Sequence, residues 1–170
     1  MIINRESRMI LAFAHPGIVV PDLDKAIDFY GKALGFRLLS DQEGWEDSPI
    51  TDRAIGCPGS TTRGAMLAGH NCYLELFEYR SPKQTAAPPG EFLAHEPGIR
   101  HIAFYVDDVK KEFERFLSVG GQPLGELVEG ATAVYGRDPF GNIIELAEIP
   151  NPDENPTKLP GVDRLGDFGA

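Results

Sequence analysis

The chain has 170 residues, 16 of them basic and 26 acidic, which gives a formal net charge of −10, and 42% of the residues are hydrophobic. A chain of this size buries a sizeable core without a disulfide scaffold. The acidic excess argues against a nucleic-acid partner, because a phosphate backbone is bound by clustered lysine and arginine.

In chain order, the first predicted elements are a strand that contains His15 and a helix that begins after Asp22. Aspartate is a favoured N-cap residue, and the apolar residues that follow recur at helical spacing as far as Gly35, a residue type that commonly ends helices. The same series returns 86 residues later, at His101, Asp108 and Gly121. The chain is therefore an internal repeat of two similar units.

Three short strands are predicted after each helix, from runs that are bounded by turn residues. In the first half these strands cover 36–40, about 64–68, and 72–79, and in the second half 124–128, 132–137 and 142–149. Each half then has the order strand, helix and three strands. This order predicts an α+β fold made of two βαβββ modules.

The repeat also sets the boundaries of the expected units. The first module covers about 9–80, a proline-containing linker covers 81–97, and the second module covers 98–149. Residues 1–150 are expected to form a single domain. The remaining residues, 151–170, are rich in proline at their start and have no apolar period, so we expect an irregular tail.

The first module is longer than the second. Its histidine lies 60 residues before the first glutamate of its last strand, and the corresponding distance in the second module is 44 residues. The excess is most easily placed in 41–62, a stretch rich in Gly, Pro, Asp and Ser that contains the only tryptophan, Trp45. Long connections of this kind are usually either functional or disordered, and we expect substrate specificity to depend on this loop and on the linker.

Four residues with metal-ligand chemistry occupy repeated positions. Side chains alternate between the faces of a strand, so His15 and Glu75 each share a face with apolar or aromatic neighbours, and His101 and Glu145 copy them in the second half. A carboxylate in such surroundings is costly unless it is paired, hydrogen-bonded or bound to a cation. These two histidines and two glutamates are therefore candidates to converge on one divalent ion.

The sequence carries a family resemblance in HPGIVVPDLDKAIDFYGKALGF, GIRHIAFYVDDV and DPFGNIIELAE. These stretches resemble the first βα unit, the fifth strand and the closing hairpin of the vicinal oxygen chelate superfamily. That superfamily includes glyoxalase I, methylmalonyl-CoA epimerase, extradiol dioxygenases, and the fosfomycin and bleomycin resistance proteins. The resemblance covers about residues 9–149 and implies two paired βαβββ modules that form a cupped mixed sheet around a metal site.

The resemblance also implies a ligand set. His15, Glu75, His101 and Glu145 match all four ligand positions of the glyoxalase I and epimerase branches. The extradiol branch has a non-ligand where Glu75 stands, which counts against an oxygenase. Two imidazoles and two carboxylates suit one six-coordinate divalent ion, and Zn, Ni, Co, Mn and Fe(II) all stay open as its identity.

The implied reaction is proton transfer at the carbon next to a carbonyl, with Glu75 or Glu145 as the base. A divalent ion stabilises the negative charge that forms when this α-proton leaves. Return of the proton to the same carbon gives epimerisation, and its return to the neighbouring carbon gives isomerisation of the glyoxalase (lyase) type. Two alternatives stay open: an Fe(II) extradiol-type ring-cleaving dioxygenase, and a non-catalytic small-molecule-binding or drug-sequestering resistance protein.

The expected partners follow from this interpretation. The substrate is a small carbonyl compound or thioester, and the candidates for binding an anionic group on it are Arg53, Arg63 and Arg100. No secretion signal and no apolar run of about 18 residues is visible, so we expect a cytoplasmic protein without a membrane partner. Because resembling proteins are often dimers and open strand edges need cover, we also expect a homodimer, with the tail lying across an edge or the partner.

Overall fold

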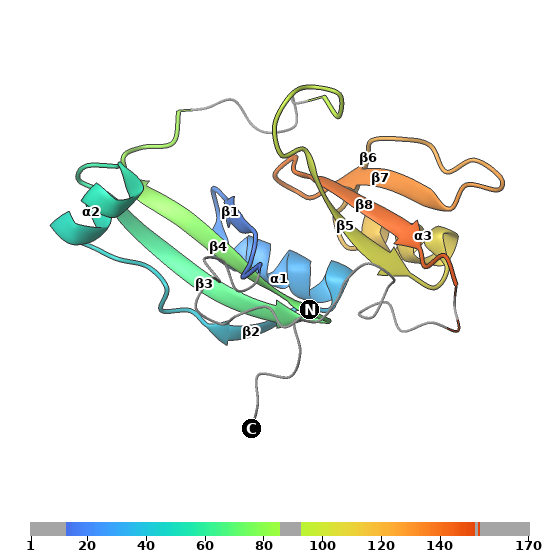
Figure 1. The fold of residues 1–170 in the computed structure, drawn as a ribbon, viewed down its shortest axis with the longest axis horizontal. Helices are drawn as coiled ribbons and strands as arrows, with labels where there is room; N and C mark the ends of the chain where they lie inside the picture. Colours follow the sequence, from blue (N-terminus) through green and yellow to red (C-terminus); the bar gives the residue numbers. More distant parts are fainter. Residues whose placement is uncertain (1–12, 86–92, 152, 154–170) are drawn as a thin grey trace, which may run out of the picture.

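Two four-stranded sheets lie side by side in the structure, a computed structural model that describes residues 13–85, 93–151 and 153 (Figure 1). The first module comprises β1 (Gly17–Val19), α1 (Leu23–Leu34), β2 (Arg37–Ser40), α2 (Pro49–Ile55), β3 (Thr61–Gly69) and β4 (Cys72–Ser81). The second module comprises β5 (His101–Val106), α3 (Val109–Ser118), β6 (Gln122–Pro123), β7 (Ala133–Arg137) and β8 (Ile143–Glu148). None of the described helices is long and apolar enough to cross a membrane.

The two sheets have the same topology, which confirms the predicted α+β fold of paired βαβββ modules. Their strand orders are β1-β4-β3-β2 and β5-β8-β7-β6, and in each sheet only the first pair is parallel. Gly17 lies opposite Glu75, and Ala103, 86 residues after Gly17, lies opposite Glu145. The sequence repeat is therefore also a repeat of strand register, and the eight strands are divided between two sheets.

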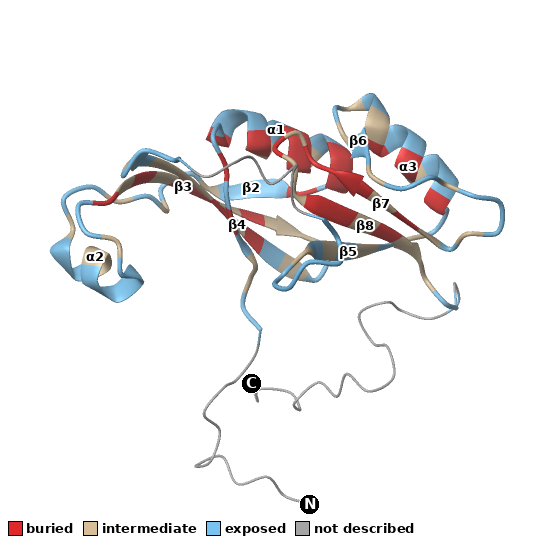
Figure 2. Cartoon of the chain, turned by 90° about the horizontal axis from the view of Figure 1, so that it is seen from above, coloured by how far each residue is buried: buried red, intermediate tan, exposed pale blue. Residues whose placement is uncertain are grey.

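Helices α1 and α3 cover the same side of the two sheets, and their buried faces point toward the strands (Figure 2). Both begin as predicted: the carboxylates of Asp22 and Asp108 accept a hydrogen bond from the backbone N–H of the residue three positions on. Helix α1 ends at Gly35, whose φ of 71° is left-handed. Gly121 was expected to end the second helix, and this prediction is wrong, because α3 ends at Ser118.

The role of Gly121 is instead steric. A Cβ atom on this residue would lie 2.2 Å from the ring of Phe116, a buried residue of α3. Phe116 also makes an edge contact with Phe29 of α1, with 5.6 Å between the ring centres. The modules thus share one hydrophobic core that passes between their helices.

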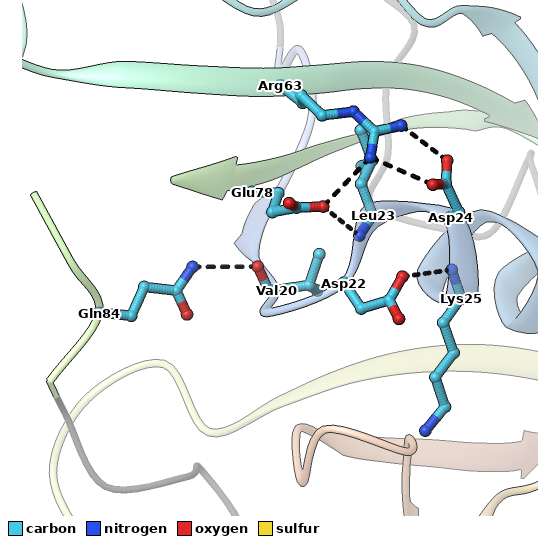
Figure 3. Close-up of polar contacts among 8 residues, drawn as sticks. All are labelled: Val20, Asp22, Leu23, Asp24, Lys25, Arg63, Glu78 and Gln84. Carbon is cyan, nitrogen blue, oxygen red and sulfur yellow. Dashed lines mark hydrogen bonds and ion pairs between the residues drawn. The ribbon is translucent and has the colours of Figure 1, made fainter. Parts of the chain in front are cut away.

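Arg63, expected as a candidate for substrate binding, lies on the helix side of its sheet (Figure 3). Its guanidinium pairs with Asp24 of α1 at 2.7 Å and with Glu78 of β4 at 3.5 Å. Glu78 also accepts a hydrogen bond from the backbone N–H of Leu23 at the start of α1. The side chain therefore fastens α1 to its sheet and is engaged there by two carboxylates.

Two further predictions differ from the structure. A strand was expected at 124–128, but β6 ends at Pro123, because the N–H groups of Leu124 and Gly125 both turn onto the carbonyl of Tyr135. The stretch at 41–62 was expected to be a loop, yet it contains α2, which has Ser48 as N-cap and Pro49 in its first turn. The expected tail at 151–170 lies almost entirely outside the described residues.

Candidate active site

The first candidate pair joins His15 and Glu75 on the side of the sheet away from α1. Glu75 lies in β4 between Leu74 and Leu76, which are buried beneath the helix, so strand alternation turns its carboxylate to the opposite face. His15 lies just before β1, and its Nε2 is 3.0 Å from Oε2 of Glu75. The two side chains are 33% and 20% exposed, so a ligand can reach them.

The second pair repeats this arrangement in the other sheet. His101 is the first residue of β5, and its Nε2 lies 3.1 Å from Oε2 of Glu145 in β8. The phenol of Tyr135, on the neighbouring strand β7, donates a hydrogen bond of 3.0 Å to the same carboxylate oxygen. Burial raises the pKa of Tyr135, and its hydrogen bond to Glu145 raises it further, so this phenol stays protonated and keeps donating.

The two pairs differ in the residue that lies across the sheet from each glutamate. Tyr135 lies opposite Glu145, whereas Met66 of β3 lies opposite Glu75. A thioether cannot donate a hydrogen bond to the carboxylate as a phenol does. Tyr135 was not among the candidates from the sequence, because its contact depends on the cross-strand register, which residue spacing along one strand does not reveal.

Within one chain the four candidate ligands form two pairs. In the described part of the chain, no three His, Cys, Asp or Glu side chains form a group that could hold a metal ion. The sequence predicted that all four side chains converge on one ion, and within one chain the structure brings each histidine to its own glutamate. The two pairs themselves lie apart in the single chain.

Apolar side chains surround both pairs and are exposed. Phe13 and Ile99, two residues before each histidine, are 81% and 94% exposed, and the repeat-related Val19 and Tyr105 are about half exposed. Both histidines also line a cavity of about 1290 Å³, which is bordered by β1 and β5, the edge strands of the two sheets. Exposed apolar surface beside polar residues is typical of ligand-binding and protein-contact sites.

The other candidates from the sequence make hydrogen bonds to nearby backbone carbonyls. The side chain of Arg53 donates to the carbonyl of Pro49 within α2, and Arg100 donates to the carbonyls of Glu96 and Pro97, although it also borders the cavity. A further histidine, His70, contacts the carbonyl of Leu34 at 2.8 Å at the end of α1. None of these contacts adds a ligand to either pair.

Comparisons with known proteins agree with this arrangement of modules. The Glyoxalase/Bleomycin resistance protein/Dioxygenase superfamily model matches residues 12–146. The chain belongs to this superfamily. An Actinomyces 2-epi-5-epi-valiolone epimerase is 32% identical over 154 residues, covering 82% of this chain and 80% of the epimerase. A lactoylglutathione lyase of Neisseria meningitidis is 26% identical over 145 residues, covering 83% of this chain and 93% of the lyase.

Among solved structures of the superfamily, a glyoxalase family protein from Bacillus cereus superposes with a TM-score of 0.74. It is 24% identical, and the match covers 85% of this chain and 98% of that protein. At this identity the likeness shows the fold alone. The two curated relatives support an enzyme of this superfamily.

Proposed function

We propose that the protein is a divalent-metal-dependent enzyme that transfers an α-proton on a small carbonyl compound or thioester. The observation that carries this proposal is the exact duplication of a His–Glu pair at matched register, His15 with Glu75 and His101 with Glu145. A module needs neither residue for its core, because all four side chains face away from the helices. The relatives named epimerase and lactoylglutathione lyase support the same class of reaction.

The donor atoms of each pair fit a divalent ion. Two ligands that bind an ion at about 2.1 Å and at right angles lie about 3 Å apart, which is the separation found in both pairs, 3.0 and 3.1 Å. Together the pairs offer two imidazole nitrogens and two carboxylate groups, without a thiolate. Such a donor set suits zinc, nickel, cobalt, manganese and ferrous iron.

Because the pairs lie apart in one chain, we infer that two copies complete each site. His15 and Glu75 of one copy meet His101 and Glu145 of the other, and a twofold axis repeats the contact, so that a dimer has two equivalent sites. The same contact covers the exposed side chains of the site-facing surfaces, including that of Ile99, which is 94% exposed. This gives the expected homodimer a physical role: the ligand set is incomplete without it.

The neighbours of the two glutamates suggest different roles for them. Tyr135 donates to Glu145 and restrains its carboxylate, so Glu145 is suited to remain a fixed ligand. Glu75 lies opposite Met66 and is free of such a donor from that position, so we assign it as the base that takes the α-proton. A divalent ion bound at the site supplies the Lewis acidity that makes this carbon acidic. Return of the proton by Glu75 to the next carbon gives an isomerisation, whereas an epimerisation also requires a second acid that protonates the opposite face of the same carbon.

The dioxygenase alternative is less well supported by the geometry. The residue that counts against it in the sequence, Glu75, pairs with His15 in the same way as Glu145 pairs with His101. Both modules therefore present the same two donors. A ring-cleaving site would require only one of the two carboxylates.

The proposal is tested by proton exchange in deuterium oxide, with acetoin, 2-hydroxycyclohexanone and the methylglyoxal–glutathione hemithioacetal as probes and NMR as the readout. The protein loaded with each candidate divalent ion is expected to exchange the α-proton of at least one probe. The variant Glu75→Gln is expected to lose roughly 10²–10⁴-fold in exchange rate, as expected for removal of a general base, and to retain much of its metal. Glu145→Gln is expected to lose metal first, measured by metal analysis.

Two results would contradict the proposal. If both glutamine variants exchange at the wild-type rate, neither carboxylate is the base. If the protein treated with a chelator exchanges as fast as the metal-loaded protein, the reaction does not depend on a metal. Metal content of the two variants separates loss of the ion from loss of the base.

A further inference from the structure

Three aromatic side chains gather beside Glu75 on the same face of the first sheet. The rings of Trp45 and Phe77 are 5.2 Å apart between centres, and those of Trp45 and Tyr79 are 6.0 Å apart, both in edge arrangements. Phe77 and Tyr79 follow Glu75 at intervals of two residues along β4, so they share its face. All three are only partly buried. We call this cluster the aromatic platform.

The start of the long loop brings Trp45 to this face by extending along β3. The N–H of Glu43 donates to the carbonyl of Gly64, and the N–H of Thr62 donates to the carbonyl of Trp45 at 2.9 Å. Gly64 makes the packing feasible, because a Cβ atom there would lie 2.7 Å from the ring of Phe77 and 2.8 Å from the backbone of Glu43. The ring of Phe77 therefore lies over a strand position that has no side chain.

The rest of the loop fixes the orientation of the indole. Nε1 of Trp45 donates to Oγ of Ser60 at 2.7 Å, and Ser60, which is 1% exposed, donates in turn to Asp52 of α2. Asp52 also accepts from the backbone N–H groups of Gly59 and Ser60. The hydrogen bond from Ser60 lowers the pKa of the Asp52 carboxyl, so the chain of contacts holds at neutral pH. Helix α2, which buries none of its own residues, serves to hold this chain of bonds.

The second module supplies an internal control. Its positions corresponding to Phe77 and Gly64 are Ala147 and Ala133, which lie opposite each other beside Glu145. This module folds with small side chains there and without a loop like 41–62. The aromatic platform is therefore not something that a βαβββ module needs for its own stability.

We propose that the aromatic platform of Trp45, Phe77 and Tyr79 is a substrate subsite that binds the C–H face of a ring, so that the enzyme acts on cyclic carbonyl compounds in preference to open-chain ones. The inference rests on the proposed function, because it takes Glu75 as the reacting group. Residues two apart on a strand lie about 6.8 Å from each other, so a small ring whose α-carbon is at Glu75 extends toward Phe77, which packs against Trp45.

The preference has an electrostatic and a hydrophobic cause. Aromatic faces carry negative partial charge and attract the positive C–H groups on one side of a saturated ring, and stacking also removes apolar surface from water. An open-chain compound must in addition lose internal rotations when it binds in one conformation, whereas a ring has lost them already. The platform thus favours a rigid ring over a flexible chain with the same reactive group.

Trp45 is the only tryptophan, so its fluorescence reports binding at the platform directly. We would titrate the metal-loaded wild-type protein with 2-hydroxycyclohexanone and, at equal concentrations, with acetoin, which has the same hydroxyketone group in an open chain. The ring compound is expected to change the emission with saturation and to bind at least tenfold more tightly than acetoin. Phe77→Ala is expected to weaken the ring compound about tenfold and to leave acetoin unchanged.

The matched control is Tyr73→Ala, which removes an exposed aromatic residue from the same face of β4 on the other side of Glu75. It is expected to keep the wild-type preference. Circular dichroism of each variant checks the fold, and Phe77→Leu, which keeps apolar volume without a ring, is expected to lose the preference even if Phe77→Ala does not fold. Equal responses to the two probes in the wild type, or an unchanged preference in Phe77→Leu, would overturn the subsite.

These outcomes are separate from those of the proposed function. In Glu75→Gln, which lacks the base, the ring compound is still expected to change Trp45 emission, because the platform does not depend on proton transfer. Binding of the ring without α-proton exchange in the wild type would refute the function and leave the subsite standing. Exchange at equal rates on both probes, with no change in emission, would refute the subsite and leave the function standing.

Discussion

The hydrogen bond between Tyr30 and Asp138 is the clearest single polar contact between the two modules. Tyr30 lies on α1, and Asp138 lies in the turn between β7 and β8 of the other module, with 2.8 Å between the phenol and the carboxylate. Both side chains are fully buried. Three other donors satisfy the same carboxylate: the N–H groups of Phe140 and Asn142 and the side-chain amide of Asn142.

The substitution Tyr30→Phe removes one oxygen and keeps the ring, whose edge contacts with Phe29 and Phe36 hold it in the core. A hydrogen bond to a charged group contributes about 1.5–3 kcal/mol, and a buried carboxylate that loses a donor cannot replace it with water. Because three donors remain on Asp138, we expect a loss near the lower end, about 1.5–2 kcal/mol. For a chain of this size this corresponds to a fall in melting temperature of about 3–8 °C.

Urea unfolding followed by far-ultraviolet circular dichroism measures this change. Tyr105→Phe is the matched control: Tyr105 is 49% exposed, and its loss of a hydroxyl is expected to change the free energy of unfolding by less than about 0.5 kcal/mol. If Tyr30→Phe is as stable as the control, or more stable than the wild type, the bond does not hold the modules together as argued.

The remaining predictions concern pH, packing and assembly. Burial, together with the Asp138 carboxylate, raises the pKa of Tyr30 well above 10.0, so above pH 10.0 the unfolded chain loses a proton that the native state retains. The free energy of unfolding of the wild type should therefore fall more steeply with pH than that of Tyr30→Phe. Equal slopes in alkaline urea titrations would contradict this. Gly64→Ala should lower stability by about 1–3 kcal/mol in thermal unfolding, because the added Cβ meets Phe77 and the backbone of Glu43. Gly125→Ala, whose Cβ would have no atom closer than 4.0 Å, should keep the wild-type stability. Equal melting temperatures of the two variants would show that Gly64 is not needed for this packing. Light scattering should show a dimer, and Ile99→Asp should dissociate it with loss of bound metal. A monomer that retains metal would rule out a site shared between two copies. Light scattering of the chain truncated after Pro150 tests whether the tail contributes to the dimer.

The sequence predicted the fold well because the information lay in a repeat. An offset of 86 residues relates two complete series of strand, cap and helix, so the pattern of each half supports the assignment of elements in the other. Parity placed the two histidines and the two glutamates at repeated strand positions, and the structure pairs His15 with Glu75 and His101 with Glu145 at 3.0 and 3.1 Å. The prediction was weaker where the halves differ: β2 forms at 37–40, whereas its counterpart β6 ends at Pro123, and the loop at 41–62 has no counterpart in the second module.

The features that sequence periodicity could not reveal all depend on contacts between strands. Tyr135 meets Glu145 only because the turn between β7 and β8 sets that register, and Trp45 meets Phe77 only because the loop continues along β3. The start of α2 carries local helix signals, a serine N-cap followed by proline, but they lie in a stretch whose composition is typical of turns.

The two modules differ in the residues that surround the His–Glu pair that both contain. Both keep the same His–Glu pair at the same register, yet the residue across the sheet from the glutamate is tyrosine in one and methionine in the other. The residue two positions after the glutamate is alanine in one and phenylalanine in the other. In the proposed enzyme the metal ligand set uses both pairs, whereas a restrained carboxylate, a base and a ring-binding surface are each needed only once. Two copies of the module satisfy both requirements, because the residues around one His–Glu pair can differ without changing those around the other pair. This is why the asymmetry between Tyr135 and Met66, rather than the pairs themselves, identifies Glu75 as the proposed base.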